Sequence, residues 1–472
     1  MQAKTKIVAT LGPASDSEEA LKKLILAGVN LFRLNFSHGS HRHHLEMIQK
    51  IRAISGRLGK NVGIMQDLSG PKIRLGQLFS EKTILKNGST IKLCAGSKSN
   101  SPDCLPVSYP RLSQEVKRGD HILLGDGEIE LRVSGIEAGK VVCRVWAGGA
   151  ISSKKGVNLP SERLTVSAVT AKDRDDLQVG VKAGVDYIAL SFVRSADDIN
   201  TLRRLIHKAG AEIPIIAKIE TTQALKNIDE IIQASDGVMV ARGDLGVEVP
   251  LEKIPEVQKA IILKANLLAR PVITATQMLR SMVENNRPTR AEVTDVANAI
   301  YDGTDAVMLS EETAVGKYPV EAVEYMERIA QEAEDDWHNA RRIFRLGPDK
   351  VQNIPEAISL SVVEMAEEMK VKAIVSPTRS GYTARLVSRL RPNVPILALS
   401  LRQETVKRLS LVWAVQAYFV PDLEKHPDLL TTASRLAKKI LKLKKGDLIA
   451  ITAGLPIGKP SLTNVVKLEV ID

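Results

Sequence analysis

Short apolar runs recur along most of the chain, and amphipathic stretches with a helical period separate them. The segment Ile213–Pro250, IPIIAKIETTQALKNIDEIIQASDGVMVARGDLGVEVP, contains two such runs around one amphipathic stretch and predicts strand, helix, strand. Six further runs predict strands at Lys4–Leu11, Leu31–Phe36, Val62–Asp67, Tyr187–Phe192, Pro271–Ala275 and Ala306–Leu309.

Eight strand–helix units with short connections predict a (β/α)₈ barrel. An open, doubly wound sheet is the alternative fold for the same alternation. That fold normally carries a glycine-rich phosphate turn after its first strand. Here the turn reads LGPAS, which lacks the pattern, so the closed barrel is favoured.

The helical period disappears between about residues 70 and 166. Short alternating runs such as TILKNGSTIKL and KVVCRVWAGG lie there between Asn-Gly, Gly-Asp and Asp-Gly turns, which predicts an inserted all-β module, a small barrel. After residue 344 the helix–strand alternation restarts and predicts a separate α/β domain. The predicted division is a catalytic barrel at 1–69 and 167–340, a β-barrel lid at 70–166 and a C-terminal α/β regulatory domain at 345–472.

Composition is that of an ordinary globular protein, with 44% hydrophobic and 26% charged residues among 472. No apolar run reaches membrane-spanning length, and the first residues, MQAKTKIVAT, lack the apolar core of a signal peptide. The three cysteines, Cys94, Cys104 and Cys143, have no metal-ligand spacing and are odd in number. We therefore predict a reduced cytoplasmic protein without structural disulfides and without a membrane partner.

The net charge of +11 suggests a nucleic-acid partner at first, but its distribution argues against one. From residue 345 to the end, 20 Lys and Arg face 12 Asp and Glu, a net of +8, so most of the excess is in the last quarter. Aromatic residues make up only 3% of the chain, too few for a base-stacking surface. Sites for small phosphorylated anions explain the excess better.

Charged residues close the two strands of the 213–250 segment. Lys218 and Glu220 follow the first, and Arg242 and Asp244 follow the second, each pair at i, i+2 and so on one side of an extended chain. Active sites of such barrels lie at the carboxyl ends of the strands. The two carboxylates suit Mg²⁺ or Mn²⁺.

Cations, hydroxyls and amides also end strands of the predicted barrel. Arg33, Lys218 and Arg242 are expected to neutralise a phosphoryl group, and hydroxyls with Gln277 to orient the rest of the substrate. Positioning and charge neutralisation are most of what phosphoryl transfer requires. The pattern predicts metal-dependent handling of a small phosphorylated or carboxylate substrate.

Eight motifs, in order, resemble those of the pyruvate kinase family. They are NFSHG (Asn35–Gly39), SGPKIR (Ser69–Arg74), KKGVNLP (Lys154–Pro160), AKIE (Ala217–Glu220), ARGDLG (Ala241–Gly246), TATQML (Thr274–Leu279), RPTRAEVTDVANA (Arg287–Ala299) and SEETA (Ser310–Ala314). The resemblance covers essentially the whole chain. It implies transfer of the phosphoryl group of phosphoenolpyruvate to ADP, giving pyruvate and ATP, the last step of glycolysis.

The resemblance implies a role for each residue at the predicted barrel mouth. Glu220 and Asp244 correspond to ligands of the divalent metal. Lys218, with Arg33 beside it, corresponds to the group that stabilises the migrating phosphoryl, where a fixed cation acts mostly in the transition state. The backbone amides around Gly243 and Asp244 correspond to those that hold the substrate carboxylate.

The remaining catalytic and nucleotide positions are also implied by resemblance only. Thr276 matches the residue that orients protonation of the enolate, and Ser310 and Glu312 match a proton relay. The nucleotide-side positions correspond to Pro13, Asn35, His38 and Lys155. Lys155 belongs to the inserted module, which would then act as a lid that excludes water. A homotetramer is expected on the same ground.

One position departs from the commonest form of the family. Many members hold K⁺ near the positions matching Asn35, Ser37, Asp67 and Leu68, and they commonly carry glutamate where this chain has Lys72. Replacing glutamate by lysine changes the local charge by two units, and a fixed ammonium can replace the monovalent ion. We therefore predict activity that does not require K⁺.

The predicted C-terminal domain contains the segment TRSGYT between a strand and a helix. Hydroxyls, an arginine and a glycine at a helix N-terminus suit a phosphate, and the family binds a phosphorylated effector in the matching loop. We expect the effector to contact Thr378, Arg379, Ser380 and Thr383. The loop Gly454–Asn464 is a second candidate contact, although Ser461 and Leu462 replace the Gly-Thr of many members.

Two other functions fit parts of the pattern. A Mg²⁺-dependent lyase acting on pyruvate or oxaloacetate uses the same barrel, but it leaves the inserted KKGVNLP motif unexplained. A non-catalytic scaffold that keeps the fold would be expected to have lost Lys218, Glu220 or Asp244, and all three are present.

Overall fold

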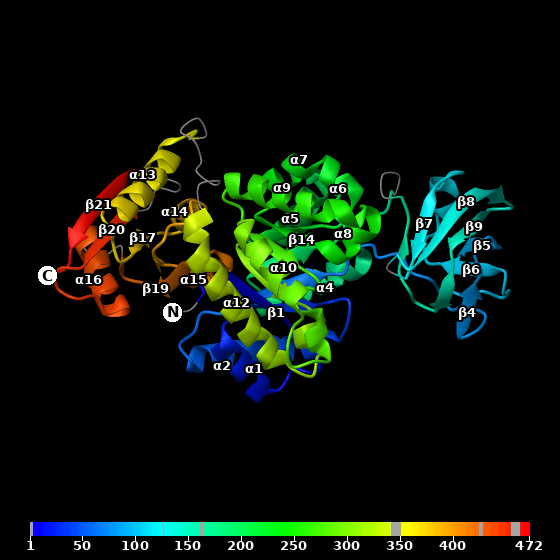
Figure 1. The fold of residues 1–472 in the computed structure, drawn as a ribbon, viewed down its shortest axis with the longest axis horizontal. Coiled ribbons are helices and arrows are strands. Elements are labelled where there is room, and N and C mark those ends of the chain that lie inside the picture. Colours follow the sequence, from blue (N-terminus) through cyan, green and yellow to red (C-terminus); the bar gives the residue numbers. More distant parts are fainter. Residues whose placement is uncertain (1–2, 126, 161–164, 341–350, 424–427, 455–462) are drawn as a thin grey trace.

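The computed structural model describes residues 3–125, 127–160, 165–340, 351–423, 428–454 and 463–472. Three bodies lie in a row in Figure 1, with a helix-wrapped barrel at the centre, the inserted β module on one side and the C-terminal domain on the other. No helix of the described residues is both long and apolar enough to cross a membrane.

Eight parallel strands close the central barrel, which confirms the predicted (β/α)₈ fold. Their order around the barrel is β1-β16-β15-β14-β13-β12-β3-β2. The strands are β1 (Lys6–Thr10), β2 (Val29–Asn35), β3 (Gly63–Leu68), β12 (Tyr187–Leu190), β13 (Ile215–Ile219), β14 (Gly237–Ala241), β15 (Val272–Ala275) and β16 (Ala306–Leu309).

Side chains alternate across each barrel strand because successive residues of a strand point to opposite faces. In β1, Val8 belongs to the cluster inside the barrel with Met65 and Ile216, whereas its neighbours Ile7 and Ala9 pack in the outer layer under the helices. The interior of the barrel is therefore a packed apolar core.

Helices cover the outside of the barrel, and polar caps start several of them. Thr170 and Thr289 form capping boxes with Asp173 and Glu292, respectively. The helices are α1 (Glu18–Ala27), α2 (His41–Arg57), α4 (Ala171–Ala183), α5 (Ala196–Lys208), α6 (Thr222–Lys226), α7 (Ile228–Ala234), α8 (Arg242–Glu248), α9 (Ile254–Leu267), α10 (Arg290–Tyr301), α11 (Glu311–Ala314) and α12 (Pro319–Ala340), with short 3₁₀ turns at Leu251–Lys253 and Arg280–Val283.

The inserted module is built from strands, as predicted, apart from the short helix α3 (Leu112–Glu115). One sheet has the order β11-β7-β8-β9-β5-β6, and β10 pairs with β4 in a separate ribbon. The segment around Leu75 closes this sheet into the predicted small barrel, because Leu75 bridges Val107 of β6 and Arg74 bridges Gly156, the residue before β11. The strands are β4 (Lys82–Leu85), β5 (Thr90–Ala95), β6 (Cys104–Val107), β7 (His121–Leu124), β8 (Ile129–Glu137), β9 (Lys140–Ala147), β10 (Gly149–Ser152) and β11 (Val157–Asn158).

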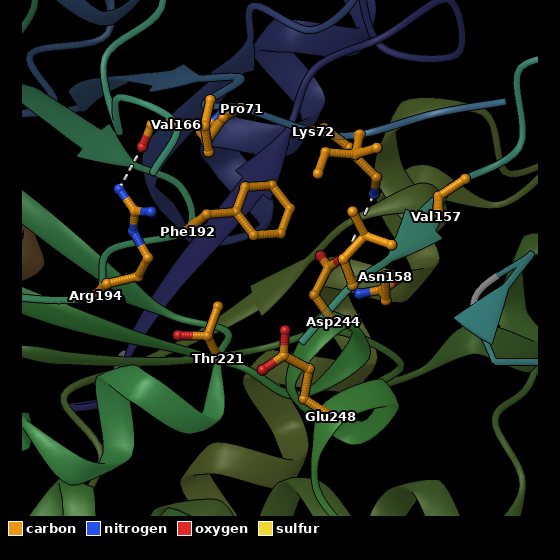
Figure 2. A pocket seen from close by; sticks show the side chains of 12 residues that line it. Pro71, Lys72, Val157, Asn158, Val166, Phe192, Arg194, Thr221, Asp244 and Glu248 are labelled. Atoms are coloured by element: carbon orange, nitrogen blue, oxygen red, sulfur yellow. Dashed lines mark hydrogen bonds and ion pairs between the residues drawn. The ribbon is translucent and has the colours of Figure 1, made fainter. Parts of the chain in front are cut away.

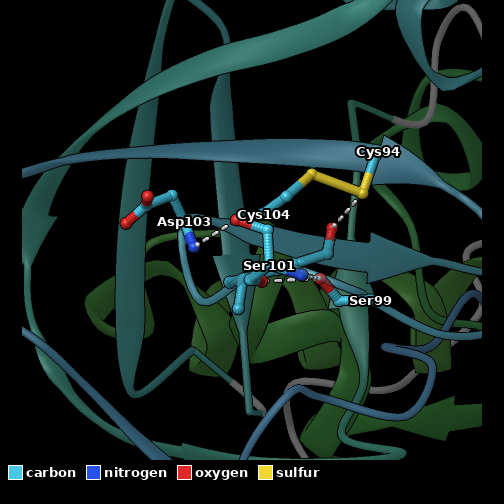
Figure 3. Close-up of a disulfide and its surroundings, with 6 residues drawn as sticks. Cys94, Ser99, Ser101, Asp103 and Cys104 are labelled. Carbon is cyan, nitrogen blue, oxygen red and sulfur yellow. Dashed lines mark hydrogen bonds between the residues drawn. A yellow bond between two sulfur atoms is a disulfide. The ribbon is translucent and has the colours of Figure 1, made fainter.

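A disulfide in the inserted module corrects the prediction that the chain has none. Cys94 and Cys104 are bonded across a separation of 10 residues, with their Cα atoms 6.3 Å apart (Figure 3). The sequence pattern did not predict this pairing. It depends on the parallel pairing of β5 with β6, and the register that aligns Lys92 with Cys104 is set only in the folded sheet. Cys143 is free and buried.

The C-terminal domain is a five-stranded sheet of order β19-β18-β17-β20-β21 with helices packed on it. The predicted alternation is confirmed, but the antiparallel edge strand β21 was not predicted. The elements are α13 (Ile354–Glu368), β17 (Ile374–Pro377), α14 (Tyr382–Ser388), β18 (Ile396–Ser400), α15 (Gln403–Arg408), the 3₁₀ turn Leu409–Leu411, β19 (Val415–Phe419), α16 (Leu429–Leu441), β20 (Leu448–Ala453) and β21 (Val465–Val470).

Candidate active site

A buried lysine lies at the centre of the barrel mouth. Lys218, on β13, places its Nζ 2.9 Å from Glu220 Oε1 and 3.4 Å from Asp67 Oδ1, and it donates a 2.6 Å hydrogen bond to Ser191 Oγ. Ser191 in turn donates to the carbonyl of Leu68 at 2.8 Å. Side chains from three strand ends thus fix the direction of one ammonium group.

Asp67 also binds the second cation of the mouth. Arg33, on β2, donates from Nε to Asp67 Oδ2 at 2.7 Å and from Nη1 to Thr10 Oγ1 at 3.1 Å. Burial alone would raise the pKa of Asp67, but the charges of Lys218 and Arg33 lower it below its ordinary value. Asp67 is therefore a fixed anion that holds two cations side by side.

The pKa values of Lys218 and Glu220 also depend on the balance between burial and neighbouring charges. Burial would lower the pKa of Lys218, yet Asp67 and Glu220 raise it, so the ammonium stays charged. Burial raises the pKa of Glu220, Lys218 opposes this, and the nearby charge of Asp244 raises it further. Glu220 accepts a 2.8 Å hydrogen bond from the amide of Phe192, a contact that the sequence did not predict. A buried carboxylate whose pKa is raised by a second carboxylate nearby favours an additional positive charge beside it.

These carboxylates fit a hard divalent cation. Among the described residues no group of three or more His, Cys, Asp or Glu side chains forms a complete metal site. Mg²⁺ is usually held by only one or two carboxylates, with the remaining positions left to water and substrate oxygens. Glu220 and Asp244 are such a pair of carboxylates. The raised pKa of Glu220 indicates that a positive charge beside it is favourable.

A small pocket of about 50 Å³ lies where the inserted module joins the barrel mouth. Figure 2 shows Lys72 reaching toward Asp244 across it, with Nζ 3.3 Å from Oδ1, while Arg194 donates to the carbonyl of Val166 at 2.6 Å. The same pocket is lined by residues 157–159 of the module. The residues joining module and barrel therefore lie directly beside a predicted metal ligand.

The structure corrects the expectation that Arg242 faces the substrate. The chain is helical from Arg242 onward, in α8, so residues two apart point about 200° apart rather than to one side. Asp244 remains at the mouth. Arg242 instead forms a two-pronged ion pair with Asp295 of α10, at 2.6 and 2.7 Å, which the sequence did not predict.

Arg242 supports a strained turn at the end of β15. It donates to the carbonyls of Thr276 at 2.8 Å and Ala275 at 3.3 Å. Thr276 and Gln277 both have positive φ, +72° and +56°, a conformation that costs energy in a β-branched residue. The Thr276 hydroxyl accepts a 2.7 Å hydrogen bond from the amide of Gly243. Arg242 is therefore a positioning residue for Thr276.

The last strand end provides a second fixed carboxylate. Glu312 is buried, and it accepts hydrogen bonds from the amides of Ser310 at 2.7 Å and Leu279 at 3.1 Å. Both of its oxygens are thus bonded to backbone, which ties the end of β16 to the segment after Thr276. Ser310 is half-buried at the start of α11.

The predicted monovalent-cation residues lie together at the ends of β2 and β3. Asn35 is paired in register with Asp67, its Oδ1 accepts from the amide of Ser37 at 3.1 Å, and Leu68 follows Asp67 in β3. Pro13, His38 and Lys155, predicted to face the nucleotide, are exposed. Lys155 is in the module, where its carbonyl accepts from the amide of Leu75 at 2.8 Å.

The predicted effector loop lies between β17 and α14. Arg379 and Ser380 are exposed, Thr378 Oγ1 accepts from the amide of Gly381 at 3.0 Å, and Thr383 is buried against Thr463 with their hydroxyls 2.7 Å apart. Ser461 and Leu462 lie outside the described residues.

A closed parallel barrel with basic and acidic side chains fixed together at the carboxyl ends of its strands defines a (β/α)₈-barrel enzyme that acts on a small anion. Comparison with known proteins identifies the family within this class of enzymes. Family models described as the pyruvate kinase barrel domain and the pyruvate kinase alpha/beta domain match residues 2–323 and 356–469.

Individual relatives agree with the family models. Pyruvate kinase 2 of Synechocystis is 47% identical over 99% of this chain and 79% of its own length, and the pyruvate kinase of Geobacillus stearothermophilus is 45% identical over 100% and 81%. The crystal structure of a pyruvate kinase from Cryptosporidium parvum superposes with a TM-score of 0.93 at 38% identity and covers 100% of this chain and 97% of that one.

The chain therefore belongs to the pyruvate kinase family. It is a phosphotransferase that moves the phosphoryl group of phosphoenolpyruvate to ADP in glycolysis, as predicted. The lyase and scaffold alternatives have no support in these comparisons.

The support that Arg242 gives Thr276 predicts a selective loss of turnover. Arg242→Lys removes the two-pronged bond to Asp295 and the bonds to the turn, so Thr276 shifts. A misplacement of about 1 Å costs about 10²-fold in rate. Steady-state kinetics should show kcat falling by about that factor, with a smaller change in KM for phosphoenolpyruvate and an unchanged circular dichroism spectrum.

Arg204→Lys is the matched control, because Arg204 forms an exposed ion pair with Asp197 on α5. It should leave kcat within twofold of the parent. A kcat for Arg242→Lys within threefold of the parent would show that the ion pair does not position the turn.

Proposed function

We propose that the barrel mouth transfers the phosphoryl group through a cationic pair, Lys218 and Arg33, that is held by Asp67. The observation that carries this proposal is the fixed ammonium of Lys218, which has three oxygen partners from three strand ends within 3.4 Å. An ADP oxygen attacks phosphorus as the bond to the enol oxygen breaks. Lys218 neutralises the charge that spreads over the phosphoryl oxygens, and it needs no reorganisation to do so.

Glu220 and Asp244 are the residues we assign to the divalent metal, Mg²⁺ or Mn²⁺. When bound, such an ion polarises phosphoryl and carboxyl oxygens and offsets their charge. The amides of Gly243 and Asp244 are assigned to the substrate carboxylate. Because Gly243 donates to Thr276 Oγ1 in the described state, a bound carboxylate exchanges with that hydroxyl.

Proton delivery to the enolate is assigned to the other side of the mouth. Thr276 is held by Arg242 and orients the protonation of carbon, and Ser310 lies at the next strand end. Glu312 is bonded to two backbone amides, which supports a role in holding Ser310 as part of the relay. Pro13, Asn35, His38 and Lys155 are assigned to the nucleotide, with the inserted module acting as the lid.

The assignment of Lys218 predicts a loss of activity without a loss of fold. Lys218→Met keeps the length of the side chain but removes the charge, so phosphoryl transfer should slow by about 10³-fold or more. Coupled pyruvate formation measures the rate, and thermal denaturation checks the fold. Lys264→Met is the control, since Lys264 pairs with Asp229 at the surface. A Lys218→Met rate within tenfold of the parent contradicts the assignment.

Lys72 supports the proposal that K⁺ is not required. Its ammonium reaches the mouth and lies 3.3 Å from Asp244 Oδ1, so a positive charge is present beside a predicted metal ligand without a monovalent ion. The ammonium of Lys72 does not simply take the place of K⁺ within the cluster Asn35, Ser37, Asp67 and Leu68. It supplies its positive charge from the side of the mouth where Asp244 lies.

The charge of Lys72 predicts how activity responds to cations. Rates in Na⁺, K⁺ and tetramethylammonium at equal ionic strength should agree within about twofold for the parent. Lys72→Glu restores a negative charge and should create a K⁺ requirement, seen as a large gain on adding K⁺. A gain of more than tenfold with the parent enzyme would rule out K⁺ independence.

The loop between β17 and α14 is proposed as the site of a phosphorylated effector, with Thr378, Arg379, Ser380 and Thr383 as its contacts. The exposed guanidinium of Arg379 and the hydroxyls around Gly381 support this. Sugar phosphates and AMP should shift the half-saturating concentration of phosphoenolpyruvate at least threefold.

Arg379→Ala should abolish that shift, whereas Arg435→Ala, at an exposed position of α16, should retain it. If neither the parent nor the Arg435→Ala variant responds to any member of the panel, the loop is not an effector site.

A homotetramer is proposed from the family, and two features of the C-terminal domain support self-association. The strand β21 is an edge of its sheet among the described strands. Beside it lie three large apolar side chains, Ile354 and Met365 on α13 and Met369 directly after it, which are 66%, 40% and 54% exposed. An unpaired edge and an exposed apolar stripe are features that a second copy can cover.

A cytoplasmic location likewise stays a prediction.

A further inference from the structure

The turn at the end of β2 carries Asn35 and His38, two of the residues assigned to the nucleotide. The amide of Phe36 donates to the carbonyl of Asp67 at 3.0 Å. Within the turn, the amide of Ser37 donates to Asn35 Oδ1 at 3.1 Å, and the amide of His38 donates to the Asn35 carbonyl at 3.2 Å. These bonds use the amides of residues 36–38 and leave the carbonyls of Phe36 and His38 to other partners.

Two side chains hold those carbonyls. Lys172, near the start of α4, donates from Nζ to the carbonyl of Phe36 at 2.6 Å. His44, in α2, has its Nε2 2.8 Å from the carbonyl of His38. Because a carbonyl oxygen only accepts, Nε2 of His44 carries the proton in this bond. The two donors therefore fix the carbonyls on either side of Ser37.

The ring of His44 is a fixed and uncharged donor. It is buried, and it stacks on the ring of Phe36 with the ring centroids 4.0 Å apart and the planes inclined by 13°. Its Nδ1 is buried and has no hydrogen-bond partner among the described residues. Burial lowers the pKa of His44. A second proton would place a buried N–H without an acceptor at Nδ1, so the ring stays neutral.

A buried carboxylate holds Lys172 in place. Asp176 lies one turn further along α4, its side chain is 0% exposed, and its Oδ2 is 2.6 Å from Lys172 Nζ. Its Oδ1 accepts from Nε2 of His41, at the start of α2, at 2.7 Å. Those two bonds are enough to join α2 to α4. The further bond from Lys172 to the carbonyl of Phe36 extends the cluster to the nucleotide turn.

The start of α4 is itself fixed to the barrel mouth. Asp173, which forms the capping box with Thr170, also accepts from the amide of Gly70 at 3.2 Å. Gln66, on β3, donates from Nε2 to the carbonyl of Asp176 at 2.7 Å. Bonds to β3 and to the segment that leads into the inserted module thus hold the helical turn that carries Lys172.

We propose that Lys172 and His44 are positioning residues for the nucleotide, acting through the carbonyls of Phe36 and His38. This inference rests on the proposed assignment of Asn35 and His38 to ADP. Both side chains act on the backbone of the turn rather than on ADP. A turn that is already held in place loses less conformational freedom when a ligand binds, so the loss of either donor weakens ADP binding. Phosphoenolpyruvate is assigned to other residues, so its binding should change little.

Steady-state kinetics of Lys172→Met test this separation, because methionine keeps the length of the side chain and removes the donor. The KM for ADP should rise about fivefold or more, while kcat and the KM for phosphoenolpyruvate stay within about twofold. Lys172→Arg restores a donor and should return the KM for ADP to within about twofold of the parent. Lys182→Met, at an exposed position of the same helix, is the control and should leave all three constants unchanged.

His44→Phe tests the second donor. It keeps a ring beside Phe36 but loses the hydrogen bond to the carbonyl of His38, so it should also raise the KM for ADP selectively. Thermal denaturation checks that each variant is folded. A merely structural role would lower the denaturation midpoint without separating the KM for ADP from the KM for phosphoenolpyruvate, and that result overturns the inference.

His38→Ala distinguishes this inference from the nucleotide assignment on which it rests. It should raise the KM for ADP, and in its background Lys172→Met should raise that KM by a smaller factor than it does alone, because the two residues act through one turn. A raised KM for ADP in His38→Ala with an unchanged one in Lys172→Met and His44→Phe overturns the inference and leaves the assignment intact. An unchanged KM for ADP in His38→Ala overturns the assignment, and the inference with it.

Discussion

The site depends on one electrostatic constraint, the pairing of Lys218 with Asp67 and Glu220 at the mouth of a closed barrel. Asp67 ends β3 and Lys218 lies on β13, with β12 between them, yet barrel closure brings their charged atoms to 3.4 Å. Removing one member leaves the other charges with fewer partners, which costs stability, although Asp67 keeps its bond to Arg33 when Lys218 is replaced. The same cluster that fixes the ammonium of Lys218 therefore also limits which residues the three strand ends can carry.

Two strand ends illustrate how local backbone decides the direction of a side chain. At β13 the chain stays extended through Lys218, which points into the mouth beside Glu220. At β14 it turns into α8 immediately, so Asp244 faces the mouth and Arg242 faces Asp295. Lys218 and Arg242 each lie two residues before a carboxylate, yet their side chains point in different directions and contact different groups. Lys218 is the one we assign to the substrate, and Arg242 holds the strained turn at Thr276.

Much of the fold was predictable because strands and helices alternate with clear periods, and the eight barrel strands fall where the apolar runs are. Features that depend on tertiary register were not predictable. The Cys94–Cys104 bond requires the parallel register of β5 and β6, and β21 lacks a fully buried run, since its residues are half-buried or exposed. In the site, Lys218, Glu220 and Asp244 followed from residue type and spacing. The direction of Arg242 did not, because nothing in the pattern marks where extended chain gives way to helix.

The central claim is that Glu220 and Asp244 together hold the divalent ion beside the ammonium of Lys218. The most direct test is a crystal of the protein soaked with Mn²⁺ and phosphoenolpyruvate and measured at the manganese absorption edge. The account predicts one strong anomalous peak bonded to a carboxylate oxygen of Glu220 and one of Asp244, with Lys72 displaced from Asp244. A manganese ion bound elsewhere in the barrel, with these two carboxylates unliganded, would contradict it.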